Sequence, residues 1–315
     1  MKKITGLIII TFIACYTSSY AQFPPVDTTI AGGTIHIVED PKDTLHDYCA
    51  ICVNHQHLII KPPYTRKFKR ELPFILTSAM VLGGGFLASS LNTTDPYTRE
   101  ELLANPPDIN SINGIDRSSA LNWSTTVAKA SDYVLLAVTV LPAVFLSEHH
   151  TSRDIRTLLI MSAEVFAFNY GFTEIAKNLV NRSRPYVYNP EVGLGARTSS
   201  TSRKSFFSGH TSHTAAATFF FAKVITDYHP TLQRGLKIGV WIFAASIPAT
   251  NGYLRVKAGK HFPTDVIAGY IAGAASGILI PQLHRTKLSK DLKEQINMGF
   301  MPIKGGMSMN LCYRF

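Results

Sequence analysis

The sequence predicts an all-α fold, a bundle of about six apolar and transmembrane helices. Apolar residues make up 46% of the chain and charged residues only 17%, a balance typical of membrane proteins. Six apolar stretches have about the length of a membrane-spanning or fully buried helix. They cover residues 73–91, 132–147, 155–173, 212–226, 236–250 and 264–282, with long polar connections at 93–129 and 178–210.

The first 21 residues predict a secretory signal peptide. A basic MKK precedes the apolar run ITGLIIITFIACY, which is short for a membrane span, and SSYA supplies small residues for cleavage after Ala21. An uncleaved anchor is the alternative, and a lipoprotein cut before Cys15 is disfavoured by the Phe12-Ile13-Ala14 that leads into it. Cleavage would remove Lys2 and Lys3 and lower the formal charge from +10 to +8.

A basic exported chain favours anionic partners such as a membrane surface or a phosphorylated substrate. Nucleic acid is not expected, because no segment interleaves basic and aromatic residues. Residues 22–70 predict a short extended or irregular segment, residues 71–285 the helical-bundle domain, and residues 286–315 a basic linker with a C-terminal tail. In the tail FMPIKGGMSMNLCYRF, a Gly-Gly turn and alternating residues predict a β-hairpin with a packing or docking role.

Two smaller patterns carry structural expectations. Cys49 and Cys52 precede His55 and His57, but this spacing does not fit a zinc finger, so a small disulfide or two thiols is favoured over a metal cluster. Glycines at 269, 273 and 277 recur every four residues and predict a stripe for close helix packing.

Three polar stretches lie among the apolar ones. In KNLVNRSRP, Lys177 and Arg184 are seven residues apart, and Pro185 predicts that the helix ends near Arg184. In FFSGHTSH, Ser208 and His210 flank a glycine where a polar loop enters an apolar run.

The third stretch, RVKAGKHFPTD, places Arg255 before His261 and Asp265. If a helix begins near Pro263, His261 and Asp265 lie one turn apart, and the carboxylate is expected to hold the imidazole.

This combination of residue types indicates phosphate chemistry. Two arginines and a lysine form a donor array for a tetrahedral oxyanion. A Ser-Gly at a helix N-terminus adds backbone N–H groups where the helix dipole favours negative charge. Two histidines allow one to attack phosphorus and the other to protonate the leaving oxygen.

The three stretches together resemble the type 2 phosphatidic acid phosphatase family, which shares its fold with class A acid phosphatases and vanadium haloperoxidases. The family pattern is Lys, six residues, Arg-Pro; then Pro-Ser-Gly-His; then Ser-Arg, five residues, His, three residues, Asp. KNLVNRSRP, FSGH and LRVKAGKHFPTD match it in order and spacing. Phe207 replaces the motif proline and Leu254 its serine, and neither supplies a group that the mechanism needs.

The resemblance implies a role for each matched residue. His261 would be the nucleophile that forms a phosphohistidine, Asp265 would orient it, and His210 would be the general acid and then the base for water. The phosphoryl oxygens would be held by Lys177, Arg184, Ser208, Gly209 and Arg255. No metal and no cofactor are implied, because fixed cations would stabilise the transition state.

Several nearby residues are expected to have structural roles. His213, one turn beyond His210, is expected to pack or form a hydrogen bond rather than take part in catalysis. Glu174 is expected to pair with Lys177 or shape the site, and Glu164 to be buried with a partner. Three basic loop residues are expected to be solvated, with a contact to a second phosphate or lipid head group as the alternative: Arg197, Arg203 and Lys204.

The orientation of the bundle presents a conflict. A signal peptide followed by six spans would leave the motifs in the cytoplasm, whereas the basic stretches YTRKFKR, SEHHTSRDIR and HRTKLSKDLK place the motifs outside. One stretch that does not span would resolve the conflict, and residues 73–91 with their Gly-Gly-Gly are the candidate. A periplasmic bundle with an apolar core is the other solution. We expect a bacterial cell-envelope protein, membrane-associated, with its site facing the periplasm.

The expected function is a phosphatase acting on a lipid phosphate: phosphatidate, an isoprenoid diphosphate or a lipid A phosphate. Three alternatives remain open. They are a periplasmic acid phosphatase with a soluble substrate, a vanadium-dependent haloperoxidase, and a non-enzymatic phospholipid binding or transport protein.

Overall fold

A computed structural model describes the backbone of residues 29–30, 33–38, 49–53, 56–60, 63–64, 68–92, 94–230, 232–285, 296–303 and 306–313. Side chains are described for residues 63–64, 72–92, 94–148, 151–230 and 232–285. The predicted signal peptide, residues 1–21, and the cysteine and histidine side chains near residue 50 lie outside this part.

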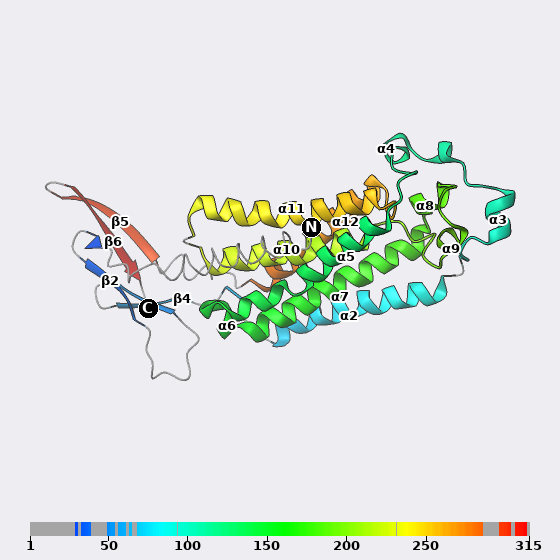
Figure 1. The fold of residues 1–315 in the computed structure, drawn as a ribbon. Coiled ribbons are helices and arrows are strands. Elements are labelled where there is room, and N and C mark those ends of the chain that lie inside the picture. The colour runs from blue at the N-terminus through cyan, green and yellow to red at the C-terminus, as the bar shows by residue number, and fades with distance from the viewer. Residues whose placement is uncertain are drawn as a thin grey trace. The chain divides into compact units, whose positions relative to one another are not determined.

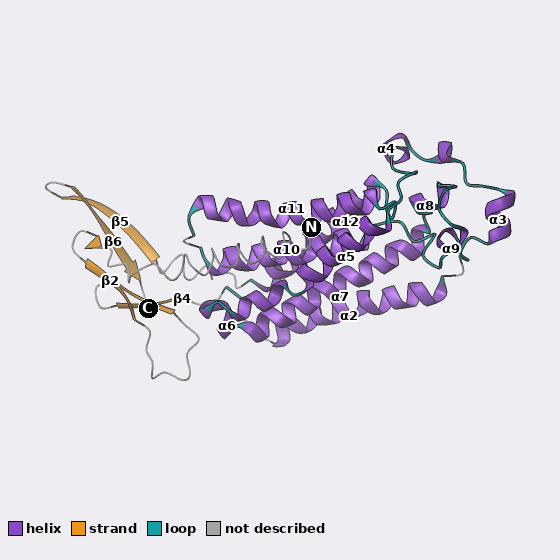
Figure 2. Cartoon of the chain, in the orientation of Figure 1, coloured by secondary structure: helices purple, strands orange, loops and turns teal. Residues whose placement is uncertain are grey.

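The predicted helical bundle is confirmed, and each of the six apolar stretches lies on a long helix (Figures 1 and 2). The helices run longer than the apolar stretches because polar residues at their ends form the terminal turns. They are α2 (Phe68–Leu91), α5 (Thr125–Thr139) extended by the 3₁₀ helix η2 (Leu141–Leu146), α7 (Ile155–Val180), α10 (Gly209–Tyr228), α11 (Arg234–Lys257) and α12 (Pro263–His284).

The two long polar connections fold into short helices that gather at one end of the bundle (Figure 1). The first connection contains α3 (Arg99–Ala104), η1 (Ile109–Ser111) and α4 (Gly114–Arg117). The second contains α8 (Pro185–Tyr188) and α9 (Leu194–Arg197), and α6 (His149–Arg153) lies between η2 and α7. The motif-bearing ends of α7, α10, α11 and α12 adjoin these connections.

Helix α10 is the most enclosed, and the predicted glycine stripe explains its contact with α12. A Cβ atom at Gly273 would lie 2.0 Å from the carbonyl oxygen of Ser212, and one at Gly277 would lie 2.5 Å from that of Ala216. At Gly269 the nearest atom would be the carbonyl oxygen of Ser208, at 2.5 Å. Only glycine permits this approach, so the stripe fixes the start of α10 against the start of α12.

Three helical segments in the described part of the chain are long and apolar enough to cross a membrane: Leu72–Leu91, Thr125–Leu146 and Pro263–His284. Large apolar side chains are exposed along the bundle, including Met80 and Leu136, as expected for a membrane-associated chain. The first of the three includes residues 73–91, the stretch with Gly83-Gly84-Gly85 that we considered as non-spanning. Its length and composition are those of a membrane-spanning helix.

The described part of the N-terminal region is extended, which is one of the two forms that we predicted. It forms an antiparallel sheet in the order β1-β2-β3-β4, made of Thr29–Ile30, Gly33–Val38, Cys49–Val53 and Gln56–Ile60. The β-branched residues of these strands favour extended backbone, and their pairing supplies the hydrogen bonds that an isolated segment would lack. The sheet lies within a compact unit, Met1–Pro62, distinct from Pro63–Phe315.

The C-terminal hairpin is confirmed. Strands β5 (Ile296–Ile303) and β6 (Gly306–Tyr313) pair antiparallel, with Ile303 opposite Gly306 next to the turn. The predicted division at residues 70 and 285 stays a prediction.

Candidate active site

The matched residues occupy helix ends, for local reasons that the sequence supplies. Helix α7 ends at Asn181, whose positive φ of 48° is a left-handed C-cap that asparagine tolerates. Pro185 and Pro263 each occupy the first turn of a helix, where the missing N–H needs no partner. Consequently Lys177 and Arg255 lie in last turns of α7 and α11, and the other matched residues lie in or beside first turns.

His261 is buried, and a backbone carbonyl fixes its tautomer. Its Nδ1 lies 2.8 Å from the carbonyl oxygen of Ser205, and its side chain is 2% exposed. A carbonyl oxygen only accepts hydrogen bonds, so Nδ1 carries the proton and Nε2 keeps its lone pair. Burial, together with Arg184 and Arg255 nearby, holds the pKa of His261 well below its usual 6.5, so the ring is neutral near pH 7.

Asp265 lies close to His261 but does not hold it in the expected way. The Oδ2 atom of Asp265 is 3.8 Å from His261 Nδ1, beyond hydrogen-bond range. Instead, this oxygen accepts hydrogen bonds from Ser205 Oγ at 2.5 Å and from the backbone N–H of Phe262 at 2.9 Å. Since Ser205 also supplies the carbonyl that binds His261, Asp265 positions the histidine through Ser205.

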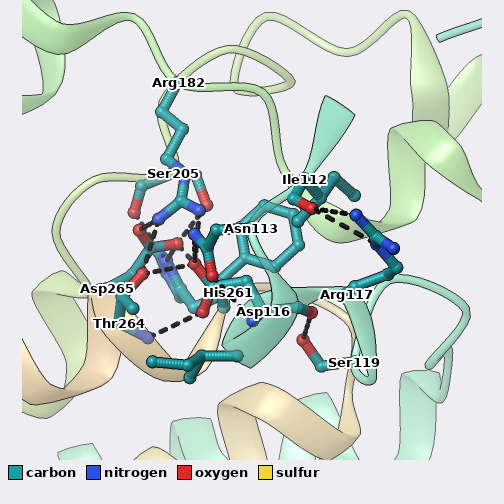
Figure 3. A network of polar contacts seen from close by, with 12 residues as sticks. Ile112, Asn113, Asp116, Arg117, Ser119, Arg182, Ser205, His261, Thr264 and Asp265 are labelled. Carbon is teal, nitrogen blue, oxygen red and sulfur yellow. Dashed lines mark hydrogen bonds and ion pairs between the residues drawn. The ribbon is translucent and has the colours of Figure 1, made fainter. Parts of the chain in front are cut away.

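A second layer of charge surrounds Asp265 (Figure 3). Arg182 donates to Asp265 Oδ1 at 2.5 Å and to Asp116 Oδ2 at 2.6 Å, and both carboxylates are fully buried. Thr264 donates to Asp116 from its backbone N–H at 3.0 Å and from its hydroxyl at 2.6 Å. Burial alone would raise the pKa of Asp116, but the bonds from Thr264 and Arg182 outweigh it and hold that pKa below 3.8.

Arg184 lies within electrostatic range of the other expected phosphate-binding cations. Burial lowers the pKa values of Lys177 and Arg255, and the positive charge of Arg184 lowers them further. The charge of Arg184 also lowers the pKa values of His210 and His261. In the described part of the chain no carboxylate forms an ion pair with Arg184, and its buried Nε has no hydrogen-bond partner. The structure therefore brings the expected cations together around a charge that is not neutralised.

Lys177 lies against the start of α10, as its expected role requires. Its Nζ would be 3.2 Å from a Cβ at Gly209, so the missing side chain leaves room for the ammonium group. Glu174 accepts from Lys177 at 2.7 Å, which confirms the expected pair.

Ser208 is confirmed as the N-cap of α10. Its hydroxyl lies 2.9 Å from Thr211 Oγ1, accepts from the Thr211 N–H at 3.4 Å, and is fully buried. The first N–H groups of α10, at Gly209 and His210, have no acceptor within the helix and offer an anion-binding surface.

His210 has a partner that the motif does not contain. Its Nε2 lies 2.8 Å from Asp132 Oδ1, on α5. The same oxygen accepts from Arg255 NH1 at 3.3 Å, and Arg255 also donates to Ser131 Oγ at 3.0 Å. The Nε atom of Arg255 is buried without a hydrogen-bond partner in the described part of the chain.

Lys260, next to His261 in the sequence, adds a further cation. Its Nζ lies 4.6 Å from the ring centre of Trp123 and 4.9 Å from that of Tyr186. Burial, with Arg184 and Arg255 nearby, lowers the pKa of Lys260 to about 8. Within the described residues no carboxylate forms an ion pair with Lys260.

The structural roles expected for His213 and Glu164 are confirmed, and the structure also places Phe207. His213 Nδ1 lies 2.8 Å from the carbonyl oxygen of Gly209, one turn back. Glu164 is buried, with Oε2 3.0 Å from His284 Nε2. Phe207, in place of the motif proline, is buried against Phe172, and the Phe206–Phe207 peptide bond is cis.

Two of the basic loop residues are not solvated as expected. Arg197 is buried and donates from Nε to the carbonyl of Val187 at 3.0 Å. Arg203 pairs with Glu101 at 2.9 Å and stacks on Tyr97. Arg203 reaches residues of the first polar connection, whereas Arg197 bonds within its own connection, and the local sequence shows neither contact.

Some site residues carried little or no sequence signal. Arg182 and Lys260 lie inside the quoted motifs at positions where the family pattern specifies no residue. Asp116 and Asp132 come from a different part of the chain, and only the packing of α4 and α5 brings them to the site.

A helical bundle that gathers several cations and two histidines at the ends of its helices has the charge arrangement of a phosphatase. The PAP2 superfamily model matches residues 158–289, which contain all three motifs. The search of curated proteins finds no match.

One solved structure is similar to this chain. It is described as the first transmembrane PAP2 type phosphatidylglycerolphosphate phosphatase from Bacillus subtilis. The two sequences are 21% identical, the match covers 68% of this chain and 93% of that one, and the TM-score is 0.40.

Proposed function

We propose that the protein hydrolyses a lipid phosphate or diphosphate through a phosphohistidine intermediate on His261. The observation that carries the proposal is the fixed tautomer of this buried histidine beside Arg184 and Arg255. A neutral imidazole with its Nδ1 proton held by a carbonyl presents Nε2 as a nucleophile, and the arginines stabilise the charge on the phosphoryl oxygens.

The reaction has two steps. The Nε2 atom of His261 forms a bond to phosphorus as the bond to the leaving oxygen breaks, and His210 gives that oxygen a proton. Neutral His210 then takes a proton from water, whose oxygen attacks phosphorus, and the bond from His261 to phosphorus breaks. Inorganic phosphate leaves, and both histidines return to their starting states.

The phosphoryl oxygens would be bound by fixed cations and by the start of α10. Arg184, Arg255 and Lys177 supply positive charge, while Gly209 offers an N–H at the positive end of the helix dipole. The hydroxyl of Ser208 is already bonded to Thr211, so we assign Ser208 to shaping this turn as well as to phosphate contact. Since these cations perform the charge stabilisation, we expect activity without a metal ion.

A lipid is the favoured substrate because the site lies at the end of a bundle with apolar outer surfaces. Segments Leu72–Leu91 and Pro263–His284 are long and apolar enough to lie in a membrane, and Pro263 is two residues from His261. A lipid phosphate could therefore reach the nucleophile while its chains stay in the membrane.

Phosphate release by the purified protein in detergent, with EDTA present, tests the activity. The panel contains phosphatidate, an isoprenoid diphosphate, a lipid A phosphate and soluble p-nitrophenyl phosphate. We expect a lipid to be preferred, activity to survive EDTA, and His261→Ala to abolish turnover. Full activity in His261→Ala would refute the mechanism, and tight lipid binding without turnover would point to a binding protein.

We also propose that the site faces the periplasm. Reporter fusions after residues 60, 110 and 290 test the orientation. A cytoplasmic signal at residue 110, in the connection that lies beside the site, would contradict it.

A further inference from the structure

We propose that Asp132 is the positioning residue of the general acid, because its carboxylate orients His210 and favours its protonated form in a cationic site. This inference rests on the proposed phosphatase activity. Asp132 lies outside residues 158–289, so the family match does not include it.

The contact is direct. Asp132 Oδ1 lies 2.8 Å from His210 Nε2, whereas the Asp265 oxygen nearest His261 is 3.8 Å from its Nδ1. A carboxylate at hydrogen-bond distance fixes the ring and favours its charged form. With Nε2 engaged by Asp132, the proton available for transfer is the one on Nδ1.

His210 needs such a partner because its other charged neighbours oppose its protonation. Burial, together with Arg255 on α11 and Arg184 after α7, lowers the pKa of His210 to about 4 and so disfavours an imidazolium. Asp132 on α5 is the carboxylate that acts against them among the described residues that face His210. A general acid must carry its proton when the leaving oxygen departs, so the rate would depend on Asp132.

The position of Asp132 also argues for a function. It lies in the second turn of α5, within the apolar segment Thr125–Leu146. A carboxylate in such a segment costs free energy and usually marks a functional site. Its side chain is 56% exposed, compared with 0% for Asp265, so it contributes little to the packing of the core. It accepts from Arg255 at 3.3 Å, which keeps its carboxylate on the His210 side.

The chemical consequence is a dependence on the leaving group. An alkoxide leaving from a lipid phosphate needs a proton in the transition state, whereas p-nitrophenolate leaves readily without one. Weakening the general acid should therefore slow lipid phosphate hydrolysis far more than p-nitrophenyl phosphate hydrolysis. Weakening the nucleophile or the fold should slow both.

The test compares Asp132→Asn with wild type on phosphatidate and on p-nitrophenyl phosphate in the same detergent. We expect kcat for phosphatidate to fall about 10- to 100-fold, and kcat for p-nitrophenyl phosphate to fall less than about 5-fold. KM should stay the same or decrease, because a negative charge beside Arg255 has been removed. The alkaline limb of the kcat profile should move about one pH unit lower.

Two further variants complete the design. Asp132→Glu should restore most of the phosphatidate activity, and Asp95→Asn, the same change at an exposed loop residue, should leave both activities unchanged. Equal losses of kcat on both substrates, or an unmoved alkaline limb, would overturn the role of Asp132. Wild type without phosphate release would instead refute the proposed function, so the two failures are distinguishable.

Discussion

Each histidine of the site has a carboxylate nearby, and the two pairs differ in burial and in contact. His261 and Asp265 are buried, 3.8 Å apart, and linked through Ser205, while Arg182 takes much of the carboxylate's charge. His210 and Asp132 are partly exposed and in direct contact at 2.8 Å.

The difference follows from the protonation that each histidine needs. A nucleophilic imidazole must be neutral, so a carbonyl at Nδ1 and a carboxylate one step removed suit His261. A general acid must be charged, so a direct carboxylate suits His210. The two histidine–carboxylate pairs would thus perform opposite tasks, and the surroundings of each histidine determine its task.

The largest expected effect comes from removing the nucleophile. His261→Asn should lower kcat/KM by about 10³-fold or more for lipid and aryl phosphates alike, because both need the bond to Nε2. Steady-state kinetics on both substrates measure this, and trapping of base-stable phosphoenzyme should fail in the variant. A large loss on lipid phosphate alone would mean that the roles of the two histidines are exchanged.

A smaller effect is expected from the charge layer behind Asp265. Arg182→Gln leaves two buried carboxylates without their shared cation, so the free energy of unfolding should fall by about 3 kcal/mol. Because the pKa of Asp116 lies below 3.8, the stability it contributes is present above that pH and is lost as the pH falls through its folded pKa.

Thermal unfolding from pH 7 down to pH 3 measures this contribution. Arg182→Lys is the matched control, since a lysine keeps the charge but cannot bind both carboxylates with a planar fork. It should have intermediate stability. An Arg182→Gln variant as stable as wild type at pH 7 would show that the network does not support His261.

Lys260 should give a pH-dependent effect on substrate binding. Its pKa of about 8 means that its charge is present below pH 8 and is lost above it. KM for a lipid phosphate should therefore rise above pH 8 in wild type, and Lys260→Met should raise KM about 3- to 10-fold at pH 7 and flatten this rise.

Lys257→Met, on the exposed side of the same turn, is the control and should keep the wild-type profile. A KM profile unchanged by Lys260→Met would assign Lys260 to packing on Trp123 and Tyr186.

The smallest effect is expected at His213, the histidine that resembles His210 in sequence. Its Nδ1 contacts the Gly209 carbonyl, so His213→Gln should cost about 1 kcal/mol of stability and change kcat less than about 3-fold. Thermal unfolding and kinetics on the two substrates check this. A loss comparable to that of His261→Asn would show that a third histidine takes part in the reaction.

Much of this protein can be predicted from local sequence. Apolar stretches determine the six long helices, because burial or a membrane requires length and continuous hydrophobicity. Glycines every four residues determine the α10–α12 contact, since a Cβ there would meet a carbonyl. Prolines and the Ser208 cap determine where helices begin, and so place the motif residues at helix ends.

The tertiary structure alone decides how these residues are set for chemistry. Spacing suggests that Asp265 holds His261 directly, but the loop carrying Ser205 comes between them and supplies the carbonyl. The carboxylates Asp116 and Asp132 reach the site from helices far earlier in the chain, 61 and 45 residues before the first motif residue, Lys177. Their contacts depend on packing over long sequence separations, which no local pattern encodes, and the contact of Asp132 gives His210 the direct carboxylate partner that His261 lacks.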